Sequence, residues 1–165
     1  MTACTDVDAE RVLREVLRVA VPDLWHCCRD PWVVIGSGAA RLIGADVSVA
    51  DLDALTSRRD AESLIEHWQA RRDPALPQEG VERFRSRFAR FVFPGLAVEV
   101  MGGLEVRGAD GWMPVTIGEV VELDIAGVAV AVPTVAEQIR LLESFGRLKD
   151  RQRLLSLKLL TGELQ

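Results

Sequence analysis

One stretch of the chain, residues 32–53, constrains the fold more than any other. It reads WVVIGSGAARLIGADVSVADLD. The apolar run at 32–35 predicts a short buried strand. The small residues Gly36, Ser37 and Gly38 that follow it permit a tight turn or the close approach of a ligand. The residues after them resemble the first turns of a helix, so Ser37 is expected at the N-terminus of that helix.

The second half of this stretch predicts a strand with two acidic residues on one face. Residues 49–55 alternate in character, and residues two apart in a strand point the same way, so Asp51 and Asp53 are expected side by side. Two neighbouring carboxylates repel each other unless a cation lies between them. A glycine-rich helix start followed by a strand with paired acids therefore indicates a phosphate group held near a divalent metal ion.

These residues resemble the signature of the polymerase β-like nucleotidyltransferase superfamily. In that signature a Gly-Ser or Gly-Gly pair opens a helix, as Gly36 and Ser37 do here. An Asp-x-Asp or Asp-x-Glu motif follows on the next strand, which Asp51 and Asp53 match. A third acid lies on a later strand between apolar residues, a position that Glu99 fits and for which Glu105 is a second candidate. The resemblance extends over about residues 30 to 155.

The C-terminal part of the chain adds to this resemblance. Residues 146–150, GRLKD, resemble a Gly-Arg-x-Lys-Asp segment of small bacterial members, including antibiotic-nucleotidyltransferase-like proteins. The resemblance implies an α/β (α+β) fold, with residues 1–165 forming a single nucleotidyltransferase-like domain whose mixed sheet is flanked by helices. It also implies Mg²⁺-dependent transfer of a nucleoside monophosphate from an NTP to an acceptor, a small molecule or a protein, that the sequence does not identify.

The resemblance also assigns roles to individual residues. The implied catalytic residues, which would bind two Mg²⁺ ions, are Asp51, Asp53 and Glu99. The implied nucleotide-binding residues are Gly36, Ser37, Gly38, Arg41 and Lys149. Backbone N–H groups and the serine hydroxyl at a helix start suit phosphate oxygens, and Mg²⁺ prefers hard oxygen ligands that it shares with substrate phosphates.

Three positions depart from the common pattern of the superfamily. Val49 stands where Thr or Ser usually precedes the first Asp, Glu99 replaces an Asp, and Arg153 replaces an acid after the Lys-Asp pair. These departures leave a second hypothesis open, namely a catalytically inactive module that binds a nucleotide or a protein. A third hypothesis is an unrelated α/β domain in which the motif match is accidental.

Residues 81–93, VERFRSRFARFVF, fit either a helix or a strand. A strand is favoured because the sheet of this superfamily needs one that leads into the Glu99 strand, with Pro94 and Gly95 as the turn. The segment concentrates positive charge in Arg83, Arg85, Arg87 and Arg90. In a strand the first three share a face on which they could meet phosphate, whereas an ion-paired surface is the alternative.

Periodicity predicts the remaining elements. Helices are expected over 6–20, 57–71, 134–145 and 149–160, and short strands over 104–106, 111–117 and 128–132. Pro22 is expected to end or kink the first helix. Thr134 is expected as the N-cap of its helix, with Glu137 at the matching position of a capping box. Trp25, Trp32 and Trp68 are expected in the core, and Cys27 and Cys28 as buried small residues.

Composition limits the function classes. Apolar residues make up 48% of the chain and charged residues 27%, which indicates a globular protein. The formal net charge of −5 argues against binding of a long nucleic acid. The cysteine and histidine spacing predicts neither a disulfide framework nor a zinc site. The chain shows neither a secretory signal nor a membrane span, so a cytoplasmic location is expected. Because the chain is short, the acceptor is expected to bind across a homodimer or on a partner protein.

Overall fold

The computed structural model describes residues 6–74 and 82–162 and has a mixed β-sheet at its centre. The strand order is β1-β2-β5-β4-β3, and β6 pairs with β5. These strands are β1 (Val33–Ile35), β2 (Asp51–Thr56), β3 (Arg72–Asp73), β4 (Phe84–Phe93), β5 (Leu96–Gly108) and β6 (Gly111–Pro114). Only the β2–β5 pair is parallel within this sheet. A separate antiparallel pair, β7 (Val120–Ile125) and β8 (Val128–Pro133), lies next to β1.

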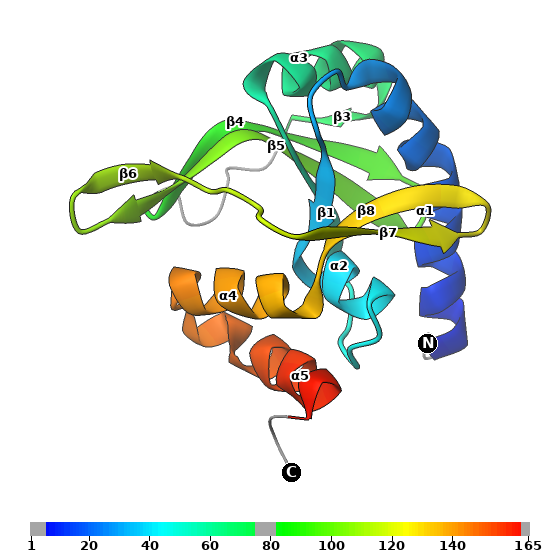
Figure 1. Cartoon of the computed structure of the whole chain (residues 1–165). Coiled ribbons are helices and arrows are strands. Elements are labelled where there is room, and N and C mark those ends of the chain that lie inside the picture. The colour runs from blue at the N-terminus through cyan, green and yellow to red at the C-terminus, as the bar shows by residue number, and fades with distance from the viewer. Residues whose placement is uncertain (1–5, 75–81, 163–165) are drawn as a thin grey trace.

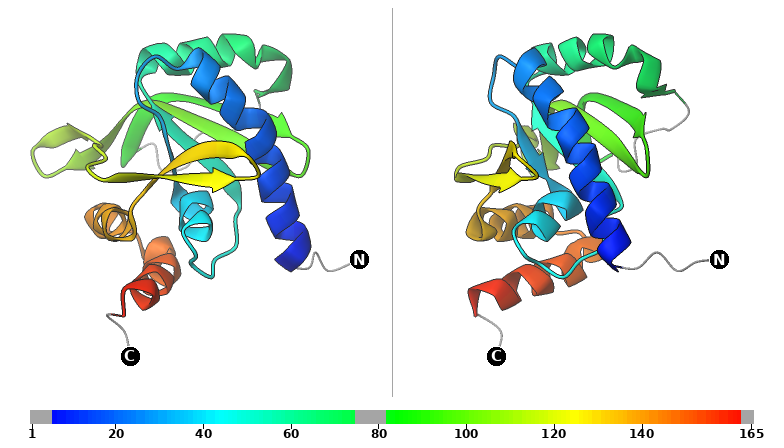
Figure 2. Two further views of the ribbon diagram at one scale, coloured as in Figure 1. Left: turned by 45° about the vertical axis from the view of Figure 1, so that its right-hand side comes forward. Right: turned by 90° about the vertical axis from the view of Figure 1, so that its right-hand side faces the viewer.

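Helices pack on this sheet from two sides (Figure 1). They are α1 (Asp6–Cys27), α2 (Gly36–Leu42), α3 (Arg58–His67), α4 (Val135–Phe145) and α5 (Arg151–Thr161), with 3₁₀ turns at Gln69–Arg71 and Leu148–Asp150. The views in Figure 2 agree that α4 and α5 lie together at the end of the molecule away from α3. The α/β fold with a mixed sheet flanked by helices, expected from the sequence, is confirmed.

The alternation of side chains along β2 and β5 separates the core from the opposite face of the sheet. Leu52 and Ala54 are fully buried, as are Val98 and Val100, and all four belong to the main core cluster with side chains of α1 and α3. Since residues one apart point to opposite faces, the acidic residues between them point away from α1 and α3. A smaller cluster, which includes Ala40, Ile139 and Leu157, joins α2, α4 and α5.

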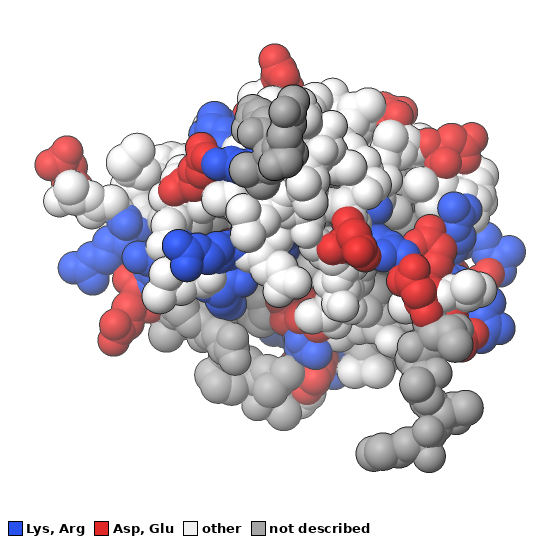
Figure 3. Space-filling model, turned by 90° about the horizontal axis from the view of Figure 1, so that it is seen from below, with Lys and Arg blue, Asp and Glu red and all other residues white. Residues whose placement is uncertain are grey.

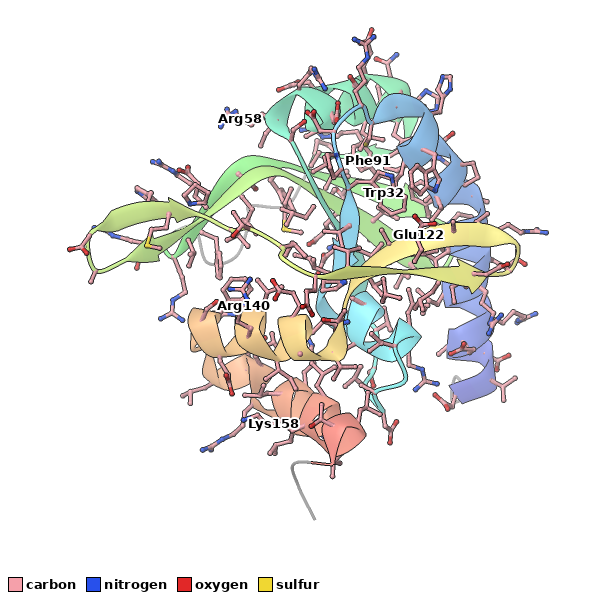
Figure 4. All side chains as sticks on the ribbon, viewed as in Figure 1. Trp32, Arg58, Phe91, Glu122, Arg140 and Lys158 are labelled. Atoms are coloured by element: carbon pink, nitrogen blue, oxygen red, sulfur yellow. The ribbon has the colours of Figure 1, made fainter. Side chains whose placement is uncertain are left out.

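Trp68 makes two aromatic contacts within the main core. The Trp68 ring meets Phe91 and Phe93 edge-on, at centroid distances of 5.1 Å and 5.3 Å. Figure 4 shows Trp32 and Phe91 in the interior, on the side of the sheet that α1 and α3 cover. Trp32 and Trp68 are buried as predicted, whereas Trp25 is 50% exposed. Its ring meets that of Trp32 edge-on, and its indole N–H donates to the Ala129 carbonyl.

Two predicted breaks in the chain are wrong. Helix α1 continues through Pro22 to Cys27, because Val21 and Leu24 on either side are fully buried and their packing outweighs the lost helical hydrogen bond. Strand β5 likewise runs unbroken through Gly102, where two shorter strands were expected. A Cβ at Gly102 would lie 2.5 Å from the Ala61 Cβ, so this glycine admits the close approach of α3 rather than ending a strand.

The strand expected in the arginine-rich segment is confirmed, whereas two strands, β3 and β7, were missed. Residues 84–93 form a strand rather than a helix. Strand β7 was not predicted, although partly buried Val121, Leu123 and Ile125 alternate there with exposed residues, which is the signal of an amphipathic strand. Cys27 and Cys28 are half-buried rather than buried, and burial raises the pKa of the Cys28 thiol to about 11, so this thiol stays protonated at neutral pH.

The N-cap of α4 yields a first testable prediction. The Thr134 hydroxyl accepts the Glu137 N–H at 3.3 Å, as expected. The Glu137 carboxylate does not complete a capping box, because it accepts the Gly118 N–H at 2.8 Å instead. We expect Thr134→Ala to lower the free energy of unfolding by about 1 kcal/mol, or Tm by about 2–4 °C. The control is Thr161→Ala at the exposed end of α5, and equal melting of the two variants would contradict the capping role.

Candidate active site

Three side chains lie next to one another across the strands β2, β5 and β4. Asp53 is the cross-strand partner of Glu99, and Glu99 is the partner of Arg90 on its other side. Asp51 lies two residues before Asp53 and therefore shares its face of the sheet. The sheet register thus brings together Asp51, Asp53 and Glu99, the three carboxylates that the sequence predicted as a site. We call these three the carboxylate row, or the row, and Arg90 lies next to it.

Arg90 bridges two of these carboxylates. Its Nη1 lies 2.6 Å from Glu99 Oε1 and 3.1 Å from Asp51 Oδ1. The side chains of Arg90, Asp51 and Glu99 are between 20% and 28% exposed, so solvent screens these ion pairs only in part. On the far side, Arg90 Nε lies 3.8 Å from Oδ2 of Asp73 on β3. One guanidinium group is therefore paired with two of the three carboxylates of the site.

Asp53 has a different environment from Asp51 and Glu99. Its Oδ1 is fully buried and has no hydrogen-bond partner among the residues that the structure describes. Burial, followed by the neighbouring carboxylate of Glu99 and then that of Asp51, raises the pKa of Asp53 well above its usual range, and the positive charge of Arg153 opposes this shift. A cation beside Asp53 would remove both the repulsion and the unsatisfied oxygen.

The start of α2 lies directly against Asp53. A Cβ at Gly36 would lie 2.5 Å from Asp53 Oδ2, and the φ angle of Gly36 is +72°, which L side chains rarely adopt. Only glycine suits both conditions at this position. Ser37 is 5% exposed, and its hydroxyl accepts the Ala50 N–H at 3.4 Å, which ties the start of α2 to the residue before β2.

A pocket of about 590 Å³ opens above this row, within the size range of small-molecule sites. Its polar lining includes Gly36, Ser37, Asp51, Asp53, Arg90, Glu99, Lys149, Asp150 and Arg153. Its apolar lining includes Ile35, Phe84, Phe88, Met101, Leu104, Leu141, Leu142 and Phe145. The face of the molecule seen from below carries positive and negative side chains interspersed (Figure 3). With these two sets of lining residues, the pocket combines a charged part with an apolar part.

The GRLKD segment forms part of the pocket wall. Asp150 is buried and accepts two hydrogen bonds from the Arg147 guanidinium, at 2.6 Å from Nε and 3.1 Å from Nη2. That guanidinium also lies over the rings of Phe84 and Phe145. Lys149, a predicted nucleotide-binding residue, lines the pocket. Arg153, noted in the sequence only as a departure from the family pattern, lines the pocket and lies 3.8 Å from Asp150.

Two predicted nucleotide-binding residues do not line this pocket. The Arg41 guanidinium turns toward α1, where it contacts Asp6 at 2.8 Å and Glu10 at 3.3 Å, because these carboxylates attract it away from the row. Gly38 is buried, and a Cβ there would lie 3.1 Å from Leu52 Cδ1, so it serves the packing of α2 on β2. The structure brings Gly36, Ser37 and Lys149 into the pocket and leaves Arg41 and Gly38 outside it.

The four arginines at 83–90 have two kinds of environment. Arg85 pairs with Glu105 at 2.5 Å, and Arg87 pairs with Glu62 of α3. Arg83 donates to the Phe145 carbonyl at 2.7 Å. Arg85 and Arg87 therefore follow the ion-paired alternative and Arg83 binds a backbone carbonyl, whereas Arg90 lines the pocket. The signal for Arg90 was present in the sequence, because a two-residue turn at 94–95 sets the hairpin register and places Arg90 opposite Glu99.

The described residues contain no group of three or more His, Cys, Asp or Glu side chains arranged to hold a metal ion. Arg90 lies among the acidic side chains of the row and holds Asp51 and Glu99 on itself. Carboxylate oxygens are nevertheless the ligands that Mg²⁺ prefers, and Asp53 Oδ1 has no hydrogen-bond partner among the described residues. Within the described part of the chain, no helix is both long enough and apolar enough to cross a membrane.

Comparison with known proteins relates this architecture to a fold. No protein-family model matches the chain, and no curated protein matches it. Among solved structures, a candidate nucleotidyltransferase from Thermotoga maritima matches with a TM-score of 0.68 and 26% identity, over 85% of this chain and 90% of that one. The chain has the polymerase β-like nucleotidyltransferase fold.

Two further structures share the nucleotidyltransferase fold at lower identity. An antigenic nucleotidyltransferase-like protein from Paracoccidioides brasiliensis matches with a TM-score of 0.54 and 15% identity, over 92% of this chain and 78% of that one. The lincosamide antibiotic adenylyltransferase LnuA in its lincomycin-bound form matches with a TM-score of 0.58 and 9% identity, over 87% and 96%. At these identities the likeness concerns the nucleotidyltransferase fold alone.

Proposed function

We propose that this chain transfers a nucleoside monophosphate from an NTP to a hydroxyl group of a small molecule or protein, with the help of Mg²⁺. One observation carries the proposal: Asp51, Asp53 and Glu99 converge on one face of the sheet, beside the Gly36 turn, in a pocket large enough for a nucleotide. The likeness to structures described as nucleotidyltransferases supports it.

The carboxylate row fits the metal that this activity requires. Asp51, Asp53 and Glu99 would hold Mg²⁺, since they supply hard oxygen atoms and Asp53 Oδ1 lacks a partner among the described residues. Bound there, Mg²⁺ would neutralise the charge that develops on the phosphate and polarise the attacking oxygen. Asp53 is suited to this role because its buried negative charge is costly until a cation compensates it.

The other parts of the pocket suit the rest of an NTP. The backbone of Gly36 and Ser37 faces the pocket beside the acids, where we expect the phosphates. Lys149 and Arg153, which also line the pocket, supply positive charge for the same group. The apolar part, with Phe84, Phe88 and Phe145 among its residues, offers aromatic surface for a ring system such as the base.

A second candidate function is a nucleotide-binding module without catalysis. The observation that favours it is the pairing of Arg90 with both Asp51 and Glu99, which engages two of the three metal-ligand candidates. Such a module would bind an NTP through Lys149, Arg153 and the α2 start without needing a divalent metal. The two functions therefore differ in whether nucleotide binding depends on Mg²⁺ and whether pyrophosphate is released.

Calorimetric titration with each of the four NTPs, with and without Mg²⁺, tests the proposal. We expect binding that requires Mg²⁺ and is lost in Asp51→Asn and in Glu99→Gln. The matched control is Glu105→Gln, because Glu105 lies on the same strand and pairs with Arg85 outside the pocket. Mg²⁺-independent binding without pyrophosphate release would favour the module, and no binding of any NTP would refute both functions.

A further inference from the structure

We infer that Arg90 is a built-in counter-ion which occupies the cation position of the carboxylate row and must move aside before a divalent metal can bind. The inference concerns the metal site of the proposed function and rests on that function for the site's purpose. The guanidinium of Arg90 and a divalent metal ion would compete for the carboxylate oxygens of Asp51 and Glu99. That competition is measurable without nucleotide, acceptor or turnover.

The first support is the way Arg90 contacts the acids. A single nitrogen, Nη1, lies within hydrogen-bond distance of one oxygen from Glu99 and one from Asp51. A guanidinium shared between two carboxylates of adjacent strands occupies the oxygens that would hold a divalent metal ion. The other arginines of β4 behave differently, since Arg85 and Arg87 each pair with one glutamate outside the pocket.

The second support is that Arg90 satisfies the row incompletely. A guanidinium is planar and directs its donors in a fixed fork, so its position is dictated by geometry as well as by charge. It reaches Asp51 and Glu99, whereas the buried Oδ1 of Asp53 has no partner among the described residues. A small cation with several coordination positions can serve all three carboxylates. The row is therefore poised to exchange the guanidinium for a metal ion.

The third support is a second carboxylate to which Arg90 can turn. Asp73 on β3 is the cross-strand partner of Arg90 on the side away from Glu99. Its Oδ2 lies 3.8 Å from Arg90 Nε, so Asp73 already forms an ion pair with Arg90 beside the contacts to Asp51 and Glu99. Arg90 thus lies between two acidic neighbours in the sheet. When a metal ion takes Asp51 and Glu99, the guanidinium keeps a counter-ion in Asp73.

Titration of the nucleotide-free protein with Mn²⁺ tests this inference. Mn²⁺ takes hard oxygen ligands as Mg²⁺ does, and its bound fraction can be read both by calorimetry and by electron paramagnetic resonance. We expect Arg90→Gln to bind Mn²⁺ at least about tenfold more tightly than the parent, because the metal no longer has to break a charge-assisted hydrogen bond. Equal or weaker binding by Arg90→Gln would overturn the inference.

Two further variants sharpen the result. Arg87→Gln removes an arginine of the same strand whose partner, Glu62, lies outside the pocket, and it should leave Mn²⁺ affinity within about twofold of the parent. Asp73→Asn should weaken Mn²⁺ binding when Arg90 is present and have little effect in the Arg90→Gln background. An equal effect of Asp73→Asn in both backgrounds would contradict the movement of Arg90 toward Asp73.

A second variant at position 90 tests the same competition if Arg90→Gln folds poorly. If Arg90→Gln is unfolded without metal because its acids repel each other, Arg90→Lys keeps a positive charge with a less directed donor set, and it should still bind Mn²⁺ more tightly than the parent. Failure of Arg90→Lys to do so would overturn the inference. The nucleotide experiment remains separate: tighter Mn²⁺ binding together with no NTP binding would reject the proposed function and retain the role of Arg90.

Discussion

The Asp53→Asn variant is expected to lose Mg²⁺-dependent NTP affinity by more than about 100-fold, since even residues that only support metal ligands are worth 10–100-fold. The same variant is expected to be more stable than the parent when no divalent metal is present. Asp53 combines a buried, unpartnered oxygen with two neighbouring carboxylates, so its charge destabilises the metal-free fold. An asparagine removes that charge and can donate a hydrogen bond to a neighbouring carboxylate.

This stability gain should depend on pH in a defined direction. The pKa of Asp53 is raised in the folded state from its ordinary value near 3.8, so the folded protein binds this proton more tightly than the unfolded chain. The stabilisation that protonated Asp53 contributes is complete below the ordinary value and is lost as pH rises through the raised pKa. The gain in free energy of unfolding of Asp53→Asn over the parent should therefore be largest at neutral pH and should decrease on acidification.

Thermal denaturation in the presence of a chelator, repeated across this pH range, measures the effect. We expect Asp53→Asn to melt about 2–4 °C above the parent at pH 7, which corresponds to about 1 kcal/mol for a chain of this size. Glu122→Gln on the exposed side of β7 serves as the control for loss of one negative charge. A lower melting temperature for Asp53→Asn than for the parent at pH 7 would refute the electrostatic account of the site.

The Gly36→Ala variant is expected to lose about 2–3 kcal/mol of stability, or at least about 4 °C in Tm, and to lose nucleotide binding with it. The added methyl group would have to displace the Asp53 carboxylate, because the Cβ position lies 2.5 Å from Asp53 Oδ2. Moving Asp53 disturbs its alignment with Glu99 in the row. The backbone strain at positive φ adds to this contact.

Gly127→Ala separates the contact from the backbone strain. Gly127 has a φ of +84°, but a Cβ there would meet no atom within 4 Å. We therefore expect Gly127→Ala to lose only about 1 kcal/mol and to bind nucleotide as the parent does. Calorimetric melting and NTP titration of both variants make the comparison. Equal losses in the two variants would show that the contact with Asp53 contributes nothing measurable.

The acidic residues of the site were predictable from local pattern. The two-residue period of a strand places Asp51 and Asp53 on one face whatever else the chain does. The same period places Glu99 on the face opposite that of its apolar neighbours Val98 and Val100. The small residues at 36–38 likewise marked the turn into α2. Arg90 was within reach of the same reasoning, because the turn at 94–95 sets its register against Glu99.

Other parts of the site depended on contacts between segments that are distant in sequence. Nothing near Arg41 indicates that Asp6 and Glu10 of α1 would attract its guanidinium out of the pocket. Arg153 lines the pocket and its charge acts on Asp53 only because α5 packs against α2 and α4. The unbroken course of β5 depends on α3 packing against Gly102.

The sequence by itself determined the α/β class, the strand faces that carry the acids and the glycine turn beside them. These features follow from the chirality and period of the backbone, which each short segment obeys alone. Only the tertiary structure decided which positive charge neutralises which carboxylate. Ion pairs depend on distances of a few ångströms between segments far apart in the chain, and those distances exist only after the sheet and helices have packed together.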